Sequence, residues 1–438
     1  MKAVILAAGR GSRIEKISNS GPKPLVRLLG LSLIERVILS IKEGGIKDFI
    51  IVTGYRAEEI KTYLGSGSHL GVKITYVDNP QWSKGNGTSL LAVKGHIKGK
   101  FILSMADHVF TPEIVKELKK QPLKDALAVV VAEPSPQPYI DLEDATKIKT
   151  QNTKVIEIGK NIEGFSHIDC GVFLVSDKIF EYIEKLQDRP TLSLNDIMQE
   201  VGLMGKLRIF ELKGQFWIDV DTPEAYRKAE ELLCNSLVKP TDGFISRTIN
   251  RPISLMISRK LVNTGLSPNT ITLFSFMVSV ISAIFLAVGN YLMTFLGGIF
   301  VQLSSIVDGC DGEVARLKHR TSEYGAWLDS VLDRYSDALI IMGITVGLYN
   351  YGLSGSKIWI IGYLALMGSL INSYTATKFD SLIKTSPKKA SWRFGRDTRL
   401  FIIMMGAILN QLYYVLLFLA IITNFVSIRR LVVMKKAY

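Results

Sequence analysis

Cysteine is scarce in this sequence, with three residues in a chain of 438. Cys170, Cys234 and Cys310 lie far apart, are odd in number and lack the close spacing of a metal-binding motif. The sequence therefore predicts neither a disulfide framework nor a cysteine metal site, and it fits a reducing cytoplasm.

The first residues of the sequence do not predict a secretory signal. The apolar run 3–8 is short, and it is followed by Gly9, Arg10 and Gly11 rather than by a small-residue cleavage site. We interpret this run as a buried first strand. No internal repeat and no low-complexity segment is evident, so nothing points to a repeat architecture.

Apolar residues are unevenly distributed. They make up 47% of the chain, and the mean hydropathy of +0.23 is high for a soluble protein. Residues 1–240 resemble a globular α/β domain, whereas runs such as 271–289 and 291–307 approach the length of about 20 residues that crosses a bilayer. The pattern predicts a soluble domain, a linker with a juxtamembrane helix, and an all-α transmembrane domain over 1–237, 238–268 and 269–438.

The chain carries a net charge of +13, and its placement suggests a partner. Basic residues cluster beside apolar runs, at 247–260, 316–320, 384–399 and 429–436. Because basic residues collect at the cytoplasmic ends of membrane spans, we expect contact with membrane lipid and no nucleic-acid binding. A solvated basic face is the alternative.

The same rule predicts a bundle of about six helices in a cell membrane, with the N-terminal domain and the C-terminus cytoplasmic. Four spans are expected at 269–289, 291–308, 325–348 and 358–377. The stretch 400–428 is expected to form two short spans that turn near Asn410 and Gln411.

Pro240, Asp242 and Gly243 punctuate the linker between the domains. The following segment, 244–262, carries apolar residues at helical spacing with basic residues among them. It predicts an amphipathic helix on the membrane surface. A soluble helix of the N-terminal domain is the alternative.

The N-terminal strand runs into a glycine-bearing loop, 8–13, and a second motif, 21–25, follows about ten residues later. Glycines let backbone approach a phosphate closely, and basic side chains offset its charge. Lys23 stands between two prolines, which suits a lysine presented to a triphosphate. The combination L-A-A-G-R-G-S-R…P-K-P-L resembles the sugar-nucleotide type of nucleotidyltransferase over about 230 residues.

That resemblance implies a Rossmann-like α/β domain in which Lys23 assists attack at the α-phosphate and the segment 83–89 reads the base. The nucleotide-binding residues it implies are Leu6, Ala8, Gly9, Gly11, Arg13, Lys23, Gly87 and Thr88. It also implies a Mg²⁺ or Mn²⁺ ion on Asp107 and on Asp219 or Asp221. Asp107 could instead be a turn or cap residue, and Asp221 could cap the helix that begins near Pro223.

The acceptor side of this domain is implied by the same resemblance. Lys160 and Asp169 match the positions that contact a sugar or polyol phosphate. A plain surface lysine is the alternative for Lys160.

The most specific motif lies in the membrane domain. Asp308 and Asp311 are three residues apart at the end of one predicted helix, and Asp329 and Asp333 are four apart at the start of the next. Each pair therefore faces one side of its helix. Carboxylates at membrane depth are costly, and two hard divalent cations would relieve their repulsion.

This stretch resembles the signature of the CDP-alcohol phosphotransferases, over about 240–438. The resemblance implies metal binding by all four aspartates, and deprotonation of an acceptor hydroxyl by Asp333. It implies CDP contacts from Asn269, Thr272, Gly312, Arg316, Ser322 and Gly325.

The order of the two domains resembles the bifunctional enzymes of di-myo-inositol phosphate synthesis. The substrates implied are CTP, inositol 1-phosphate and CDP-inositol, and the assembly implied is a homodimer. Arg393, Arg396 and Arg399 are candidates for the acceptor phosphate. Two alternatives remain: a CDP-diacylglycerol-dependent phospholipid synthase, and a degenerate first domain that serves as a scaffold.

Overall fold

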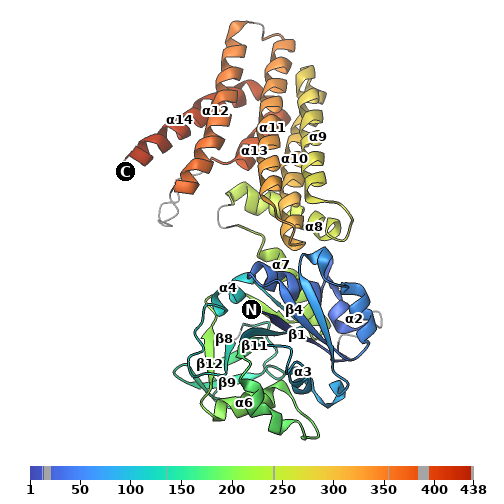
Figure 1. Cartoon of the computed structure of the whole chain (residues 1–438). Helices are drawn as coiled ribbons and strands as arrows, with labels where there is room; N and C mark the ends of the chain where they lie inside the picture. Colours follow the sequence, from blue (N-terminus) through green and yellow to red (C-terminus); the bar gives the residue numbers. More distant parts are fainter. Residues whose placement is uncertain are drawn as a thin grey trace. The chain divides into compact units, whose positions relative to one another are not determined.

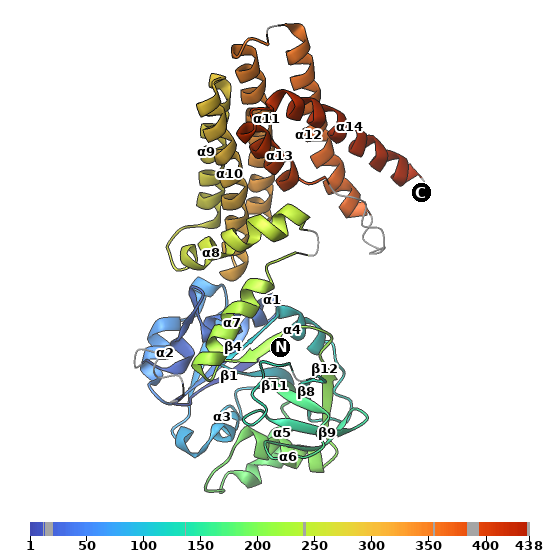
Figure 2. The same cartoon turned by 180° about the vertical axis from the view of Figure 1, so that it is seen from behind.

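The computed structural model describes residues 1–11, 13, 21–135, 137–239, 242–353, 355–382 and 394–435. The chain divides into two compact units, Met1–Leu233 and Cys234–Tyr438. Figures 1 and 2 show the elements of both units from opposite sides.

The first unit is built on a mixed sheet of nine strands among the described residues, in the order β5-β4-β1-β6-β11-β8-β12-β10-β9. Strands β5, β4, β1 and β6 are parallel, and β11 joins β6 antiparallel. The sheet strands are β1 (Ala3–Ala7), β4 (Asp48–Thr53), β5 (Lys73–Asp78), β6 (Lys100–Met105), β8 (Ala128–Glu133), β9 (Lys147–Gln151), β10 (Lys154–Gly159), β11 (His167–Ser176) and β12 (Leu207–Glu211). Two small ribbons pair β2 (Arg27–Leu28) with β3 (Leu31–Ser32) and β7 (His108–Phe110) with β13 (Trp217–Asp219).

Helices cover both faces of this sheet. Alternate residues of β1 point to opposite sides: Ile5 packs with α1, α2 and α4, whereas Leu6 packs with α3, α5 and α6. Every residue of β1 is buried, as a central parallel strand requires. The helices are α1 (Leu33–Glu43), α2 (Ala57–Leu64), α3 (Asn86–Ala92), α4 (Pro112–Leu118), α5 (Ile179–Ile183), α6 (Leu194–Leu203) and α7 (Pro223–Asn235). The predicted Rossmann-like α/β architecture is confirmed.

The second unit is helical (Figure 1). Its helices are α8 (Arg251–Leu261), α9 (Pro268–Val288), α10 (Tyr291–Leu317), α11 (Glu323–Asn350), α12 (Ser356–Leu382), α13 (Arg396–Ile408) and α14 (Leu412–Lys435). Within the described ranges, four helices are long and apolar enough to cross a membrane: α9, α10, α12 and α14. The predicted helical membrane domain is confirmed.

Helices α11 and α13 are not among those four, because one carries charged residues and the other is short. At 1.5 Å per residue, the 28 residues of α11 extend about 42 Å, but its aspartates lower its hydropathy. Helix α13 has only 13 residues, fewer than the about 20 that cross a bilayer. The predicted turn is present, because α13 ends at Ile408 and Asn410 has φ 55°. Helix α14, at 24 residues, is longer than predicted.

Small residues let α9 and α11 approach closely. A Cβ on Gly343 or Gly347 would collide with the backbone carbonyls of Ala283 or Leu286 on α9. Close backbone approach through small residues is the usual way in which membrane helices associate. It fixes α11 against α9 on the segment that follows its aspartates.

The juxtamembrane segment is helical, as predicted, but its buried face is polar. A π-helical turn over Ser246–Asn250 leads into α8, and Ser254 and Ser258 are buried against α10. Ile253 and Met256 are exposed. The sequence pattern identified the apolar stripe, but it could not show that the serines would pack inward.

Candidate active sites

A cavity of about 1170 Å³ opens at the carboxyl ends of β1 and β6, the usual ligand position in an open α/β sheet. It brings together most of the predicted site residues of the first unit. Those lining it are Leu6, Ala8, Gly9, Gly11, Arg13, Lys23, Asp107, Lys160, Asp169, Asp219 and Asp221. Gly87 and Thr88 do not line it.

Gly87 and Thr88 instead lie against neighbouring backbone. A Cβ on Gly87 would lie 2.7 Å from the carbonyl oxygen of Ser193. The hydroxyl of Thr88 donates to the carbonyl of Gly85 at 2.7 Å. These contacts hold the start of α3, and the neighbouring Asn86 lines the cavity.

Lys23 lies at the centre of the first site. Its side chain is 7% exposed, and its Nζ is 2.6 Å from Asp107 Oδ2 and 3.8 Å from Asp219 Oδ1. Nζ also forms an ion pair with Asp221. Gly11 has φ 65°, and a Cβ there would lie 2.5 Å from Cβ of Lys23. The glycine of the loop is therefore needed to seat this lysine.

His108 completes this cluster, and sequence reasoning missed it. Its Nδ1 is 2.8 Å from Asp107 Oδ1, and strand pairing sets it opposite Asp219. Burial acts to lower its pKa, but the carboxylates of Asp219 and Asp107 outweigh burial and raise the pKa of His108 to about 9. Gly171, with φ 68°, leaves room for the ring, because a Cβ would collide with it. The only signal was its position beside Asp107.

The charges around Asp107 hold it ionised. Burial acts to raise its pKa, but Lys23 and His108 outweigh burial, and the pKa of Asp107 falls well below its usual range. Ligand atoms of Asp107, His108 and Asp219 lie within 4.8 Å of one another. Within the described part of the chain, Asp219 Oδ1 is buried and makes no hydrogen bond. These oxygens fit a hard divalent cation.

Asp144 is a second residue that sequence reasoning missed. Its carboxylate forms ion pairs with both Arg13 and Lys160, and so links the predicted triphosphate and acceptor sides of the cavity. It lies between β8 and β9 in a segment without a motif. Nearby, burial raises the pKa of Asp169 to about 6, and this carboxylate accepts a bond from the backbone N–H of Gly171 at 2.8 Å.

The second site lies between the C-terminal part of α10 and the N-terminal part of α11. Oxygens of Asp308, Asp329 and Asp333 lie within 4.8 Å of one another. Asp329 Oδ1 is buried and, among the described residues, makes no hydrogen bond. An acidic cluster with such an oxygen fits a divalent cation.

Asp311, the fourth predicted ligand, lies outside that group of three. Its carboxylate accepts from the hydroxyl of Thr272 at 2.5 Å and from the backbone N–H of Gly312. Thr272 therefore contacts an aspartate here.

The other predicted CDP contacts gather beside these aspartates. The hydroxyl of Ser322 accepts from the N–H of Gly325 at 3.0 Å, and a Cβ on Gly325 would lie 3.2 Å from Oδ1 of Asn269. A Cβ on Gly312 would lie 3.1 Å from a terminal nitrogen of Arg316. The Nε of Arg316 is buried without a hydrogen-bond partner within the described ranges.

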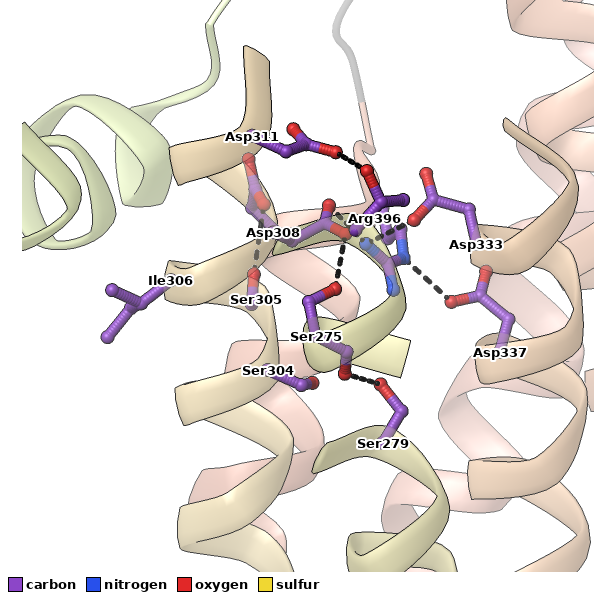
Figure 3. A network of polar contacts seen from close by, with 12 residues as sticks. Ser275, Ser279, Ser304, Ser305, Ile306, Asp308, Asp311, Asp333, Asp337 and Arg396 are labelled. Atoms are coloured by element: carbon purple, nitrogen blue, oxygen red, sulfur yellow. Dashed lines mark hydrogen bonds and ion pairs between the residues drawn. The ribbon is translucent and has the colours of Figure 1, made fainter. Parts of the chain in front are cut away.

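Arg396, at the start of α13, reaches Asp308 and Asp333 of this cluster (Figure 3). Its terminal NH1 is 2.9 Å from Asp308 Oδ2 and 2.7 Å from Asp333 Oδ1. Arg399 is buried one turn further along α13 and pairs with Asp337 at 2.7 Å. Arg393, the third predicted arginine, lies outside the described residues.

Glu313 anchors the juxtamembrane helix to α10 and was not predicted. Its side chain is 0% exposed and accepts from Arg251 at 2.7 Å, Ser254 at 2.6 Å and Ser258 at 2.7 Å. Arg251 also pairs with Asp242 at 2.9 Å. The anchor lies two residues beyond Asp311, so it ties α8 to the end of α10 that carries the predicted aspartates.

Glu313→Ala is expected to destabilise the second unit by roughly 1–3 kcal/mol, because buried donors on α8 lose their acceptor while Arg251 keeps its ion pair with Asp242. The check is the midpoint of thermal unfolding of the detergent-purified chain. Glu323→Ala is the control, since Glu323 is exposed on α11. Equal midpoints for the two variants would contradict the anchor.

Comparisons with known proteins agree with this division. Residues 2–236 match the nucleotidyl transferase family, and residues 265–427 match the CDP-alcohol phosphatidyltransferase family. The chain is thus an enzyme with two transferase domains.

Similarity to curated proteins extends over the whole chain. The bifunctional IPC transferase and DIPP synthase of Rubrobacter xylanophilus is 36% identical, with 99% of this chain and 96% of the relative covered. The proteins of the same name from Archaeoglobus fulgidus and Aquifex aeolicus are 36% and 34% identical, with 97% and 96% of this chain and 82% and 95% of the relatives covered. The chain belongs to the family of bifunctional IPC transferases and DIPP synthases.

A solved structure of the inositol-1-phosphate CTP transferase from T. maritima is 25% identical, with 53% of this chain and 94% of that chain covered. The TM-score is 0.48.

Proposed function

We propose that the first domain makes CDP-inositol from CTP and inositol 1-phosphate, and that the second consumes it. The second domain transfers the inositol phosphate of CDP-inositol to another inositol 1-phosphate, which releases CMP and gives phosphorylated di-myo-inositol phosphate. The observation that carries this proposal is the presence of two intact polar sites in one chain. The full-length similarity to bifunctional relatives supports it.

In the first reaction, a phosphate oxygen of inositol 1-phosphate attacks the α-phosphorus of CTP, and pyrophosphate leaves. Lys23 and Arg13 line the cavity and would offset the charge of the triphosphate. Asp107 and Asp219 would hold Mg²⁺ or Mn²⁺, which supplies further charge neutralisation at the α-phosphate. Asp221 is favoured as the partner of Lys23 and Arg13, because it already pairs with both.

Lys23→Ala is expected to slow CDP-inositol synthesis at least about tenfold, since a positioned charge at a phosphoryl centre is lost. The check is the rate of pyrophosphate release from CTP and inositol 1-phosphate. Lys98→Ala, on an exposed lysine, is the control. Supplied CDP-inositol should restore CMP release in the Lys23 variant, and failure to do so would show that the first domain does more than make the donor.

In the second reaction, a hydroxyl of the acceptor attacks the β-phosphorus of CDP-inositol, and CMP leaves. Asp333 would accept the hydroxyl proton. Asp308, Asp311 and Asp329 would hold divalent cations, which polarise the pyrophosphate. Arg396, with Arg399 behind it, would bind the phosphate of the acceptor.

We also propose that the soluble domain and the C-terminus are cytoplasmic and that the chain forms a homodimer in the membrane. The exposed Ile253 and Met256 of α8, with basic residues beside them, support contact between this helix and lipid. Cross-linking and accessibility labelling from each side of sealed vesicles would test both statements.

Mass spectrometry of the products tests the whole proposal. The full chain in lipid vesicles, given CTP and inositol 1-phosphate, should form CDP-inositol first and the phosphorylated phosphodiester later, with pyrophosphate and CMP released. Release of CMP from CDP-diacylglycerol, without turnover of CDP-inositol, would contradict it.

A further inference from the structure

Asp337 is a buried carboxylate that the reactions proposed above do not use. It follows Asp329 and Asp333 at intervals of four residues, so three carboxylates lie along one face of α11. Its side chain is 3% exposed, yet it stands apart from the cluster formed by Asp308, Asp329 and Asp333. In Figure 3 it points toward Arg396.

Both oxygens of Asp337 accept from arginines of α13. The Nε of Arg396 donates to Oδ1 at 3.1 Å, and a terminal nitrogen of Arg399 donates to Oδ2 at 2.7 Å. Arg399 also donates to the hydroxyl of Ser373 on α12 at 3.1 Å. A buried charge pair with its hydrogen bonds satisfied has a defined geometry, whatever its net contribution to stability.

The other end of Arg396 lies at the reacting centre, because its NH1 is within 2.9 Å of oxygens of Asp308 and Asp333. A guanidinium is planar and rigid, so fixing Nε decides where the terminal nitrogens point. The backbone just before it is also held: Asn372 on α12 donates to the carbonyl of Phe394 at 3.0 Å, and Arg430 on α14 donates to Asn372. The position of Arg396 is therefore set by side chains of four other helices, α10, α11, α12 and α14.

Arg396 reaches the aspartates from a different helix than the donor contacts. The predicted CDP contacts Asn269, Ser322 and Gly325 lie at the starts of α9 and α11, whereas Arg396 comes from α13. An arginine that comes from a helix without predicted CDP contacts suits the anionic group of the second substrate rather than the donor. Without Asp337, Arg396 would pair only with Asp308 and Asp333, and nothing would fix the orientation of its guanidinium toward a phosphate.

We propose that Asp337 is a positioning residue that fixes Arg396 to bind the phosphate monoester of the acceptor, and thereby selects a phosphorylated alcohol over a neutral one. The inference rests on the second reaction proposed above. It adds a residue outside the four-aspartate motif and assigns it the choice of acceptor.

The test uses Asp337→Asn in the full chain, with CDP-inositol as donor and either inositol 1-phosphate or myo-inositol as acceptor. The KM for inositol 1-phosphate should rise at least about tenfold, as expected when a charged hydrogen bond is lost, while the KM for CDP-inositol stays within about twofold. The preference for the phosphorylated acceptor should fall by a similar factor. Glu323→Gln makes the same carboxylate-to-amide change at an exposed position of α11. It should alter neither the KM for inositol 1-phosphate nor the acceptor preference.

A second variant separates positioning from general support of the fold. Arg396→Lys keeps the charge but loses the planar Nε donor, so it should raise the same KM, and adding Asp337→Asn should cause no further rise. If Asp337→Asn does not fold, Arg396→Lys alone decides: an unchanged acceptor KM overturns the proposal. Effects that are equal for both substrates, or additive in the double variant, also overturn it.

Calorimetric binding of inositol 1-phosphate distinguishes failure of this inference from failure of the proposed function. If the wild-type chain neither binds inositol 1-phosphate in the second domain nor releases CMP from CDP-inositol, the proposed reaction is wrong, and the inference falls with it. If the wild type does both and Asp337→Asn binds the acceptor equally well, only the inference is wrong.

Discussion

Asp329→Asn is expected to abolish transfer from CDP-inositol and to leave CDP-inositol synthesis unchanged. Asp329 belongs to the acidic cluster of the second unit, and one of its oxygens is buried without a hydrogen bond among the described residues. The role proposed for Asp329 is to hold a cation at a phosphoryl centre, and losing such a carboxylate removes several kcal/mol of transition-state stabilisation. A loss of about 4 kcal/mol corresponds to about 10³-fold in rate.

The measurement compares two rates in one preparation of purified, folded protein: pyrophosphate release from CTP, and CMP release from supplied CDP-inositol. Asparagine has nearly the same shape as aspartate, so a packing defect is a poor explanation for a selective loss. The Lys23→Ala variant provides the mirror image, because it should lose only the first rate. If both rates fell together in Asp329→Asn, the two sites would not be independent.

Residues that chemistry requires at a fixed spacing were predictable from the sequence. Each predicted motif consists of residues that are close together in the sequence. The examples are the loop with Gly9 and Gly11, the proline-flanked Lys23, and the acidic pairs on adjacent helices. The lengths of the apolar runs likewise predicted the first strand and the helical membrane domain.

Residues that act through distant partners were not predictable. Glu313 meets Arg251 across 62 positions, and Asp337 meets Arg396 across 59. His108 faces Asp219 only because β7 pairs with β13. Asp337 did carry one signal, the continued four-residue spacing after Asp333, but spacing alone cannot show whether a carboxylate faces a cation, an arginine or a helix neighbour.

Asp308 and Asp333 have similar surroundings, which makes them a matched pair for separating metal binding from proton transfer. Both contact NH1 of Arg396, and their side chains are 21% and 17% exposed. Asp308 also accepts from the hydroxyl of Ser275 at 2.9 Å. Asp333 lies one turn beyond Asp329 on the same face of α11, and beside the arginine proposed to hold the acceptor.

Asp333→Asn is therefore expected to cut turnover of CDP-inositol by about 10²–10⁴-fold, the range for loss of a general base, while cation and CDP-inositol still bind. An asparagine oxygen can still ligate a hard cation, but it cannot take the hydroxyl proton. Asp308→Asn should instead weaken cation binding itself, so that added Mg²⁺ or Mn²⁺ recovers part of its rate. Calorimetric titration of both variants with the cation decides between the roles, and an equal loss of affinity would make Asp333 a ligand rather than the base.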